Sequence, residues 1–164
     1  MDIEDFSDSK VGCSACLLGA KCRYDGDSKE NLDLIEFFEN TNIEPIFICP
    51  EVLGGLPTPR IPSEICDGTA SQFWEDNSDV RVMNSQNIDV SRQFRAGALR
   101  ALEILKENQI GTVILMEKSP SCGVHLTYSG NFNGKLIPGS GVSTALFKKN
   151  EINVLTSEEF LCKS

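Results

Sequence analysis

Short runs of apolar and small residues recur along the chain, and turn-forming residues bound each of them. They cover residues 11–16, 45–48, 112–116 and 152–155. Runs of this length without polar alternation are typical of strands buried on both faces. The sequence therefore predicts several internal strands.

Helical patterns lie between these runs. Residues 29–40 repeat apolar positions near helical spacing, with Ser28 as the expected N-cap. A longer helix is expected from Asp89, its N-cap, to about residue 108, and a third helix over residues 142–149.

The order of these elements predicts the fold class. Strands that alternate with helices form parallel sheets through right-handed crossovers. We therefore expect an α/β protein with one open, mainly parallel, Rossmann-like sheet, in three layers, with helices on both faces. In such sheets, ligands bind beyond the carboxyl ends of the strands.

Three segments are less regular. Residues 50–62 hold four prolines and two adjacent glycines, and we interpret them as a stiff, irregular active-site loop. Residues 64–87 are compatible with a hairpin or with an irregular excursion. Residues 128–141 are expected to form glycine-rich turns.

Three cysteines lie at or beyond the ends of predicted strands. Cys16 ends the first apolar run, Cys49 follows the second, and Cys122 lies in the loop after the third. Because the carboxyl ends of parallel strands meet at one edge of a sheet, we expect the three thiols to converge there. This convergence is the main functional signal in the residues themselves.

Length and charge narrow the function classes. At 164 residues and 40% apolar content, the chain is long enough to bury one core without disulfides. We expect a single domain over residues 11–164, preceded by an acidic extension over residues 1–10. A net charge of −9 favours a small-molecule substrate and disfavours nucleic acid.

The N-terminus and the cysteine content indicate the compartment. The first residues are acidic and polar, unlike an export signal, and no apolar stretch is long enough to span a bilayer. Seven cysteines in a reducing cytosol are more typical of metal ligands, catalytic thiols and core residues than of disulfides. We expect a cytoplasmic protein with no membrane partner.

Three converging thiolates suit zinc, copper(I) or an iron-sulfur cluster. A closed zinc site needs a fourth ligand, and His125, the only histidine, is expected to be a solvated loop residue. In a cubane cluster, three cysteines leave one iron with an exchangeable position, and an open iron is a Lewis acid. A structural zinc domain and an iron-sulfur protein both remain open at this point.

The other cysteines have simpler interpretations. Cys13 and Cys16 form C-x-x-C, but Cys13 lies inside a predicted strand and not at the helix N-terminus that activates such thiols. Cys22, in the loop after Cys16, is the most credible additional ligand. Cys66 and Cys162 are expected to have no part in the site.

Several spaced motifs surround these cysteines. They are residues 14–19 (SACLLG), 22–26 (CRYDG), 49–51 (CPE), 54–56 (GGL), 59–60 (PR), 119–123 (SPSCG), 130–134 (GNFNG) and 138–142 (PGSGV). Together they resemble a bacterial family long described as a domain of unknown function, which includes the iron-sulfur thiouracil desulfidases. The resemblance extends from about residue 11 to residue 159.

The resemblance implies a cofactor and a reaction. It implies a 4Fe-4S cluster on three cysteines that match Cys16, Cys49 and Cys122, with one iron open. It also implies non-redox removal of sulfur from 4-thiouracil, giving uracil and hydrogen sulfide. Glu51 and Ser119 match positions expected to help with proton transfer and ring orientation.

Several polar residues are candidates for the chemistry. Glu51 is expected to be a general base, with backbone capping as the alternative. Ser119 and Ser121 are expected to donate hydrogen bonds to the substrate ring or to the cluster, with turn formation as the alternative. Arg60 is expected either to offset the cluster's charge or to be a solvated surface residue. The residues 139–141 before a helix are a weak candidate for an anion site.

Two functions of other classes compete with the enzyme. One is an iron-sulfur or metal carrier, or a redox sensor, without turnover. The other is the structural zinc domain. Within the enzyme class, a small thiolated nucleobase or nucleoside is the expected substrate.

Overall fold

The computed structural model describes residues 10–163 and has a parallel sheet at its centre, with the strand order β2-β1-β5-β8. The strands are β1 (Lys10–Ser14), β2 (Glu44–Ile48), β5 (Thr112–Ile114) and β8 (Asn153–Leu155). All three neighbouring pairs run parallel. The four predicted strands are therefore present, each within two residues of its expected bounds.

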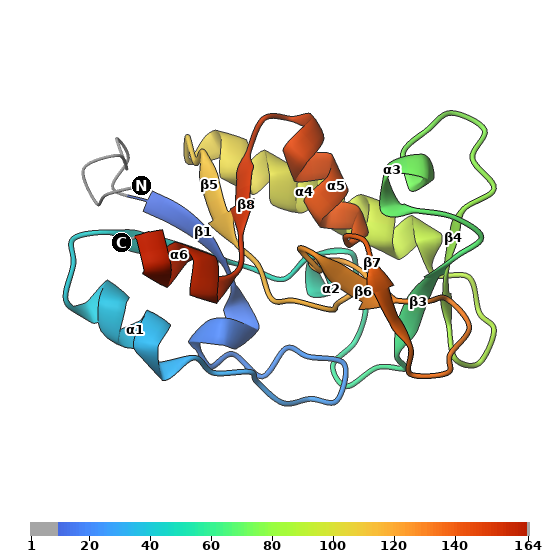
Figure 1. Ribbon diagram of the computed structural model, residues 1–164, viewed down its shortest axis with the longest axis horizontal. Helices are drawn as coiled ribbons and strands as arrows, with labels where there is room; N and C mark the ends of the chain where they lie inside the picture. The colour runs from blue at the N-terminus through green and yellow to red at the C-terminus, as the bar shows by residue number, and fades with distance from the viewer. Residues whose placement is uncertain (1–9, 164) are drawn as a thin grey trace.

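Helices pack on both faces of this sheet (Figure 1). On one face, α4 (Ser91–Glu107) and α5 (Val142–Lys149) contribute to an apolar cluster that includes Leu105, Val113, Phe147 and Val154. On the other face, α1 (Leu32–Glu39) and α6 (Ser157–Lys163) contribute to a second cluster that includes Val11, Leu34, Ile114 and Phe160. The predicted α/β class is confirmed.

Two antiparallel strand pairs lie beside the sheet. β3 (Ser63–Cys66) pairs with β4 (Arg81–Asn84), and the one-turn helix α3 (Ala70–Phe73) lies between them in the chain. Of the two arrangements that the sequence left open for residues 64–87, the structure has the antiparallel strand pair and not an irregular excursion. β6 (Leu126–Tyr128) pairs with β7 (Leu136–Pro138), where the sequence predicted turns over most of the segment. Strands of three residues are too short to produce an alternation signal.

The helix N-termini differ from the prediction. Asn31, and not Ser28, caps α1, because its side chain accepts a hydrogen bond from the Leu34 N–H at 3.0 Å. Val90 occupies the N-cap position of α4, while the neighbouring Asp89 carboxylate accepts from the Ser91 N–H at 2.8 Å. Several polar residues precede each helix, and the tertiary structure selects which of them is used.

The proline-rich segment is more regular than expected. Its first residues form the one-turn helix α2 (Pro50–Leu53), with Pro50 in the first turn, where proline is well tolerated.

The end of the predicted first strand is instead a short 3₁₀ helix, η2 (Ala15–Leu18). Helix α6 was not predicted from the sequence.

The acidic extension expected over residues 1–10 lies outside the described residues, apart from Lys10, which begins β1. Within residues 10–163, no helix combines the length and apolar character needed to cross a bilayer.

Candidate functional site

A large cavity lies at the carboxyl edge of the parallel sheet. Its volume is about 1280 Å³, and its wall includes Cys16, Cys22, Cys49 and Cys122. Ligand pockets commonly measure about 300–1,000 Å³, so there is room for a prosthetic group together with a small substrate. The expected convergence of Cys16, Cys49 and Cys122 is therefore present in the structure.

The turn that follows β1 places Cys16 on the cavity wall. Cys16 lies in η2 and is 7% exposed, and its thiol donates to the Met116 sulfur at 3.3 Å. Met116 follows β5, the neighbour of β1 in the sheet. Adjacent strand ends thus contribute both sulfur atoms.

Close backbone packing fixes Cys49 and the residues after it. Cys49 is the N-cap of α2, and α2 packs directly on α4. A Cβ at Gly97 of α4 would overlap the Pro50 carbonyl, and a Cβ at Gly54 would overlap the Gln93 carbonyl. Glycine is required at both positions because no other residue permits this approach.

Hydrogen bonds with Ser119 and Thr144 hold the loop that carries Cys122. The Ser119 hydroxyl oxygen accepts from the backbone N–H groups of Ser121 at 3.0 Å and Cys122 at 3.1 Å. The Thr144 hydroxyl of α5 donates to the Cys122 carbonyl at 3.0 Å. Cys122 is consequently held with its side chain 7% exposed.

The N-terminus of α5 donates hydrogen bonds to the loop that carries Cys122. The Val142 N–H donates to the Pro120 carbonyl at 2.8 Å, and the Ser143 N–H donates to the Ser121 carbonyl at 2.9 Å. These are donors that a helix start otherwise leaves unpaired. Within residues 139–141, the Gly139 N–H donates to the His125 carbonyl at 2.9 Å and the Gly141 N–H donates to the Gly123 carbonyl at 2.8 Å. These contacts favour a tight turn over the anion site that was considered for this segment.

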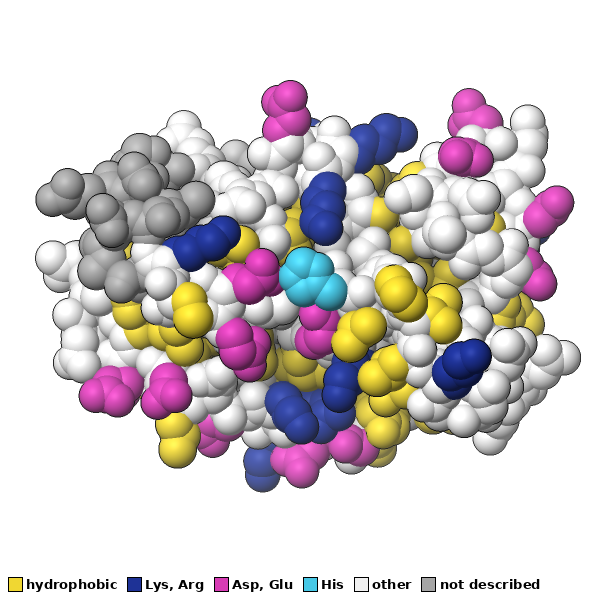
Figure 2. All heavy atoms as spheres, viewed as in Figure 1, with side chains coloured by type: hydrophobic (Ala, Val, Ile, Leu, Met, Phe, Trp, Pro, Cys, Tyr) yellow, Lys and Arg dark blue, Asp and Glu magenta, His cyan; other side chains and the backbone are white. Residues whose placement is uncertain are grey.

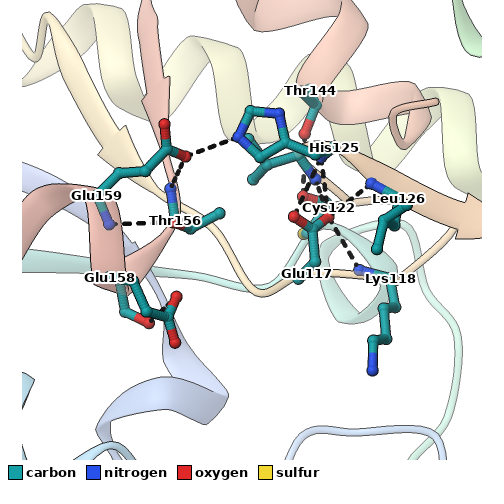
Figure 3. Close-up of polar contacts among 11 residues, drawn as sticks. Glu117, Lys118, Cys122, His125, Leu126, Thr144, Thr156, Glu158 and Glu159 are labelled. Carbon is teal, nitrogen blue, oxygen red and sulfur yellow. Dashed lines mark hydrogen bonds and ion pairs between the residues drawn. The ribbon is translucent and has the colours of Figure 1, made fainter. Parts of the chain in front are cut away.

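Glu117 is a loop-shaping residue that sequence reasoning missed. One of its carboxylate oxygens accepts from the backbone N–H groups of Val124 at 2.6 Å, His125 at 2.9 Å and Leu126 at 3.1 Å (Figure 3). It fixes the path of the chain immediately after Cys122. The available signal was a carboxylate directly after an apolar strand and before a turn.

Glu51 has a hydrogen-bonding partner on each carboxylate oxygen. The Arg60 Nε–H donates to Oε1 at 3.0 Å, and the Ser119 hydroxyl donates to Oε2 at 3.3 Å. The Glu51 side chain is 16% exposed, and both Glu51 and Ser119 line the cavity. The backbone-capping alternative is not observed among the described contacts of the Glu51 carboxylate.

Arg60 is a buried cation and not a surface residue. Its side chain is only 5% exposed. Besides its ion pair with Glu51, its guanidinium donates to the carbonyls of Cys22 at 2.9 Å and Pro57 at 3.1 Å. A cation this well satisfied keeps its position and places a fixed positive charge in the cavity wall.

Ser121 lies apart from the cavity. It is 1% exposed, and its hydroxyl shares a 2.9 Å hydrogen bond with the Ser143 hydroxyl of α5. It is not one of the described residues that line the cavity. The geometry favours the turn-forming alternative, and the catalytic role expected for Ser121 stays a prediction.

Cys22 adds a fourth thiol to the three expected ones. It lines the same cavity as Cys16, Cys49 and Cys122, and its backbone carbonyl accepts from the Cys49 thiol at 3.9 Å. It belongs to the irregular segment between η2 and α1 and is half-buried. The sequence indicated Cys22 as an additional candidate ligand. It did not indicate how far Cys22 lies from Cys16, Cys49 and Cys122.

The remaining cysteines lie elsewhere. Cys13 is fully buried within β1, and burial raises the pKa of its thiol to about 12. Cys66 lies at the end of β3, and Cys162 is exposed on α6. None of the three lines the cavity. All seven cysteines are free thiols.

His125 lies on the surface beside carboxylates (Figure 2). It is not an isolated loop residue, because its Nε2 is 2.8 Å from the Glu159 carboxylate of α6. This hydrogen bond, the largest cause, lowers the pKa of Glu159. His125 is not among the residues that line the cavity.

The thiols form a donor set that suits a soft metal group. A hydrogen bond with Cys22, followed by burial, raises the pKa of Cys49. Burial, followed by the nearby charges of Cys49 and Glu51, raises the pKa of Cys122. Without a metal these thiols stay protonated, whereas bound cations deprotonate ligand thiols directly.

A cluster site needs a different arrangement of thiols from a site for one metal ion. Within residues 10–163, no group of three histidine, cysteine, aspartate or glutamate side chains is placed to hold one metal ion. In a cubane cluster each thiolate binds a different iron, so the thiols surround the group and do not meet at one point. Cys16, Cys49 and Cys122 come from three separate strand ends around one cavity.

Comparisons with known proteins agree with this geometry. A family model described as 2-thiouracil desulfurase matches residues 11–159. A protein of Bacillus subtilis strain 168, YbbK, described as uncharacterized, is 37% identical over 146 residues, which cover 89% of this chain and 94% of the relative. A solved structure described as the [4Fe-4S]-dependent thiouracil desulfidase TudS (DUF523Vcz) is 35% identical, with a TM-score of 0.79 and 95% coverage of each chain.

Proposed function

This chain belongs to the 2-thiouracil desulfurase family and is an enzyme, and we propose that it removes sulfur from 4-thiouracil with the help of a 4Fe-4S cluster. Cys16, Cys49 and Cys122 are the proposed ligands. The observation that carries this proposal is the placement of three thiols and a doubly held carboxylate, Glu51, around one cavity. The family finding favours turnover over the carrier, sensor and zinc alternatives.

The cofactor and the protein have separate tasks in this proposal. When bound, an iron that lacks a protein ligand supplies a Lewis acid for the thiocarbonyl sulfur. The protein positions the ring, activates water and moves protons. The fixed charge of Arg60 also offsets part of the negative charge that three thiolates bring to the cavity.

Glu51 is the proposed general base. Arg60 and Ser119 hold its two oxygens, so its carboxylate stays in one orientation toward the cavity. From there it takes a proton from the water that attacks the sulfur-bearing carbon. The same carboxyl group then returns this proton to the departing sulfur. As the ring regains its carbonyl, the hydroxyl on that carbon gives up its own proton through the Glu51 carboxylate to the sulfide, so both protons of the water leave as hydrogen sulfide.

Ser119 is proposed to position both Glu51 and the substrate. Its hydroxyl connects the Glu51 carboxylate with the backbone of the Cys122 loop. This connection sets the distance between the base and the ligand loop. A substrate ring in the cavity can accept the Ser119 hydrogen bond in place of Glu51.

A matched pair of variants tests the role of Glu51. Glu51→Gln keeps the side chain's shape but cannot accept a proton, and we expect sulfide release to fall by about a hundredfold or more while the iron content is unchanged. Glu103→Gln, on the exposed surface of α4, is the control. Activity retained by Glu51→Gln with a full cluster would rule out the assignment.

The position of the sulfur is tested with two substrates. We propose 4-thiouracil, whereas the family description names 2-thiouracil. Sulfide release from each compound by the same cluster-loaded preparation distinguishes them. A higher kcat/KM for 2-thiouracil would replace the proposed substrate without changing the reaction.

We also propose that the enzyme acts in the cytoplasm. Its seven cysteines are all free thiols, which suits a reducing compartment. The substrate is proposed to be a free base or nucleoside, because the chain's net charge of −9 disfavours a polyanion.

A further inference from the structure

The fourth thiol of the cavity, Cys22, has no task in the proposed reaction. It lines the same cavity as the three proposed ligands, Cys16, Cys49 and Cys122. A cubane cluster has four irons. The cavity thus offers as many thiols as the cluster has metal atoms.

The backbone of Cys22 is anchored at the site. Its carbonyl accepts a hydrogen bond from Arg60 Nη2 at 2.9 Å and lies 3.9 Å from the Cys49 sulfur, which donates to it. Arg60 in turn holds Glu51. The Cys22 thiol therefore cannot move far from the cavity, but rotation about χ1 can carry it between staggered positions.

Cys22 differs from the other three cysteines in its surroundings. Cys16 and Cys122 are buried, and Cys49 caps a helix that is pressed against α4. Cys22 is half-buried and lies in a segment without regular secondary structure. Cys49 is half-buried as well, so packing is what separates them: the other three cysteines belong to η2, to the start of α2 and to the loop bonded to α5, whereas Cys22 lies in an irregular segment of the cavity wall.

We propose that the Cys22 thiolate binds the fourth iron in the resting enzyme and gives up this position when a thiolated substrate enters. The inference rests on the proposed function, because it assigns the iron that the three other cysteines leave open. Cys22 would thereby protect that iron from loss while no substrate is bound.

The exchange balances without any redox reagent. One iron–sulfur bond to Cys22 breaks, and one bond to the incoming sulfur forms, so no electron is transferred. When 4-thiouracil binds, the ring N–H conjugated with the thiocarbonyl loses its proton, and the departing Cys22 thiolate takes that proton up. When an added thiol binds instead, its S–H proton is transferred in the same way. The number of protons and the net charge are unchanged.

Competition with an added thiol tests this exchange without measuring turnover. Cluster-loaded wild type, Cys22→Ala and Cys162→Ala are titrated anaerobically with 2-mercaptoethanol, and binding to the cluster is followed by EPR of the reduced state. Cys162→Ala is the control because Cys162 is exposed on α6 and does not line the cavity. We expect half-saturation of Cys22→Ala at a several-fold lower concentration, because an occupied position lowers the apparent affinity for a competitor.

A second measurement follows the loss of iron. On mild oxidation with ferricyanide, we expect Cys22→Ala to form a three-iron cluster several-fold faster than wild type or Cys162→Ala. Equal rates and equal half-saturation in all three proteins would overturn the proposal. Complete absence of a cluster in Cys22→Ala would also overturn it, since Cys22 would then be a permanent ligand.

The two proposals fail in different ways. If wild type releases sulfide but Cys22→Ala behaves like wild type in both measurements, the displaceable ligand is wrong and the desulfidase stands. If wild type releases no sulfide but Cys22→Ala shows both differences, the ligand exchange stands and the substrate is wrong.

Discussion

The Ser119 hydroxyl donates to the Glu51 carboxylate at 3.3 Å. The same hydroxyl oxygen accepts from the Cys122 N–H at 3.1 Å. Glu51 follows β2 and Cys122 follows β5, so this one side chain connects two of the strand ends that form the cavity. The proposed base and a proposed ligand are thereby held at a fixed separation.

Removing the Ser119 hydroxyl should therefore lower activity more than stability. A hydrogen bond to a charged group contributes about 1.5–3 kcal/mol, so we expect Ser119→Ala to lower kcat by roughly tenfold to a hundredfold. Ser119→Thr, which keeps the hydroxyl, should retain most of the activity. An Ala variant with full kcat and a full cluster would contradict the positioning role.

Arg60 should be needed for both stability and the orientation of Glu51. Removing one partner of a largely buried ion pair costs about 3–5 kcal/mol, and we expect Arg60→Met to lose a large part of that amount in urea unfolding. The Arg60→Met, Glu51→Gln double variant should lose less than the sum of the two single variants, because the two residues interact directly. If the double variant loses as much stability as the two single variants together, Arg60 and Glu51 do not stabilise each other.

The packing of α2 on α4 should tolerate no side chain at Gly97. A Cβ there overlaps the Pro50 carbonyl, so Gly97→Ala has to shift α2, and we expect it to cost about 1–3 kcal/mol and to reduce cluster content. Gly111→Ala is the matched control, since a Cβ at Gly111 meets no atom within 4 Å. Equal iron content and equal stability in the two variants would contradict the proposed restraint on Cys49.

Cys13 should be chemically inert in the folded protein. The thiolate is the reactive form, and burial raises the pKa of Cys13 to about 12, so very little thiolate is present near neutral pH. We expect iodoacetamide to modify the exposed Cys162 long before Cys13, as measured by peptide mass spectrometry. Comparable rates at the two positions in folded protein would contradict this burial.

The sequence predicted the convergence of the thiols because that convergence depends on topology. Apolar runs identify the strands, parallel order places their carboxyl ends together, and Cys16, Cys49 and Cys122 then share an edge. No side-chain detail is needed for this step. Helices with one clear apolar face, such as α4 and α5, were predicted for the same reason.

The contacts inside the site were not predictable in the same way. The Arg60–Glu51 ion pair depends on how residues 50–62 fold back, and no periodic pattern describes that path. The burial of Ser121 against Ser143 depends on the docking of α5 on the Cys122 loop. From the local sequence alone, Arg60 and Ser121 could each lie on the protein surface or in the functional site. Only the tertiary packing determines which of these positions each residue takes.

The most direct test of the central claim combines cluster content with turnover. Wild type, Cys16→Ala, Cys49→Ala, Cys122→Ala and the control Cys162→Ala are reconstituted anaerobically with iron and sulfide and then supplied with 4-thiouracil. We expect sulfide release from wild type and Cys162→Ala, and loss of both the cluster and sulfide release in the three other variants. Sulfide release by any of those three without a cluster, or by wild type loaded with zinc alone, would contradict the account.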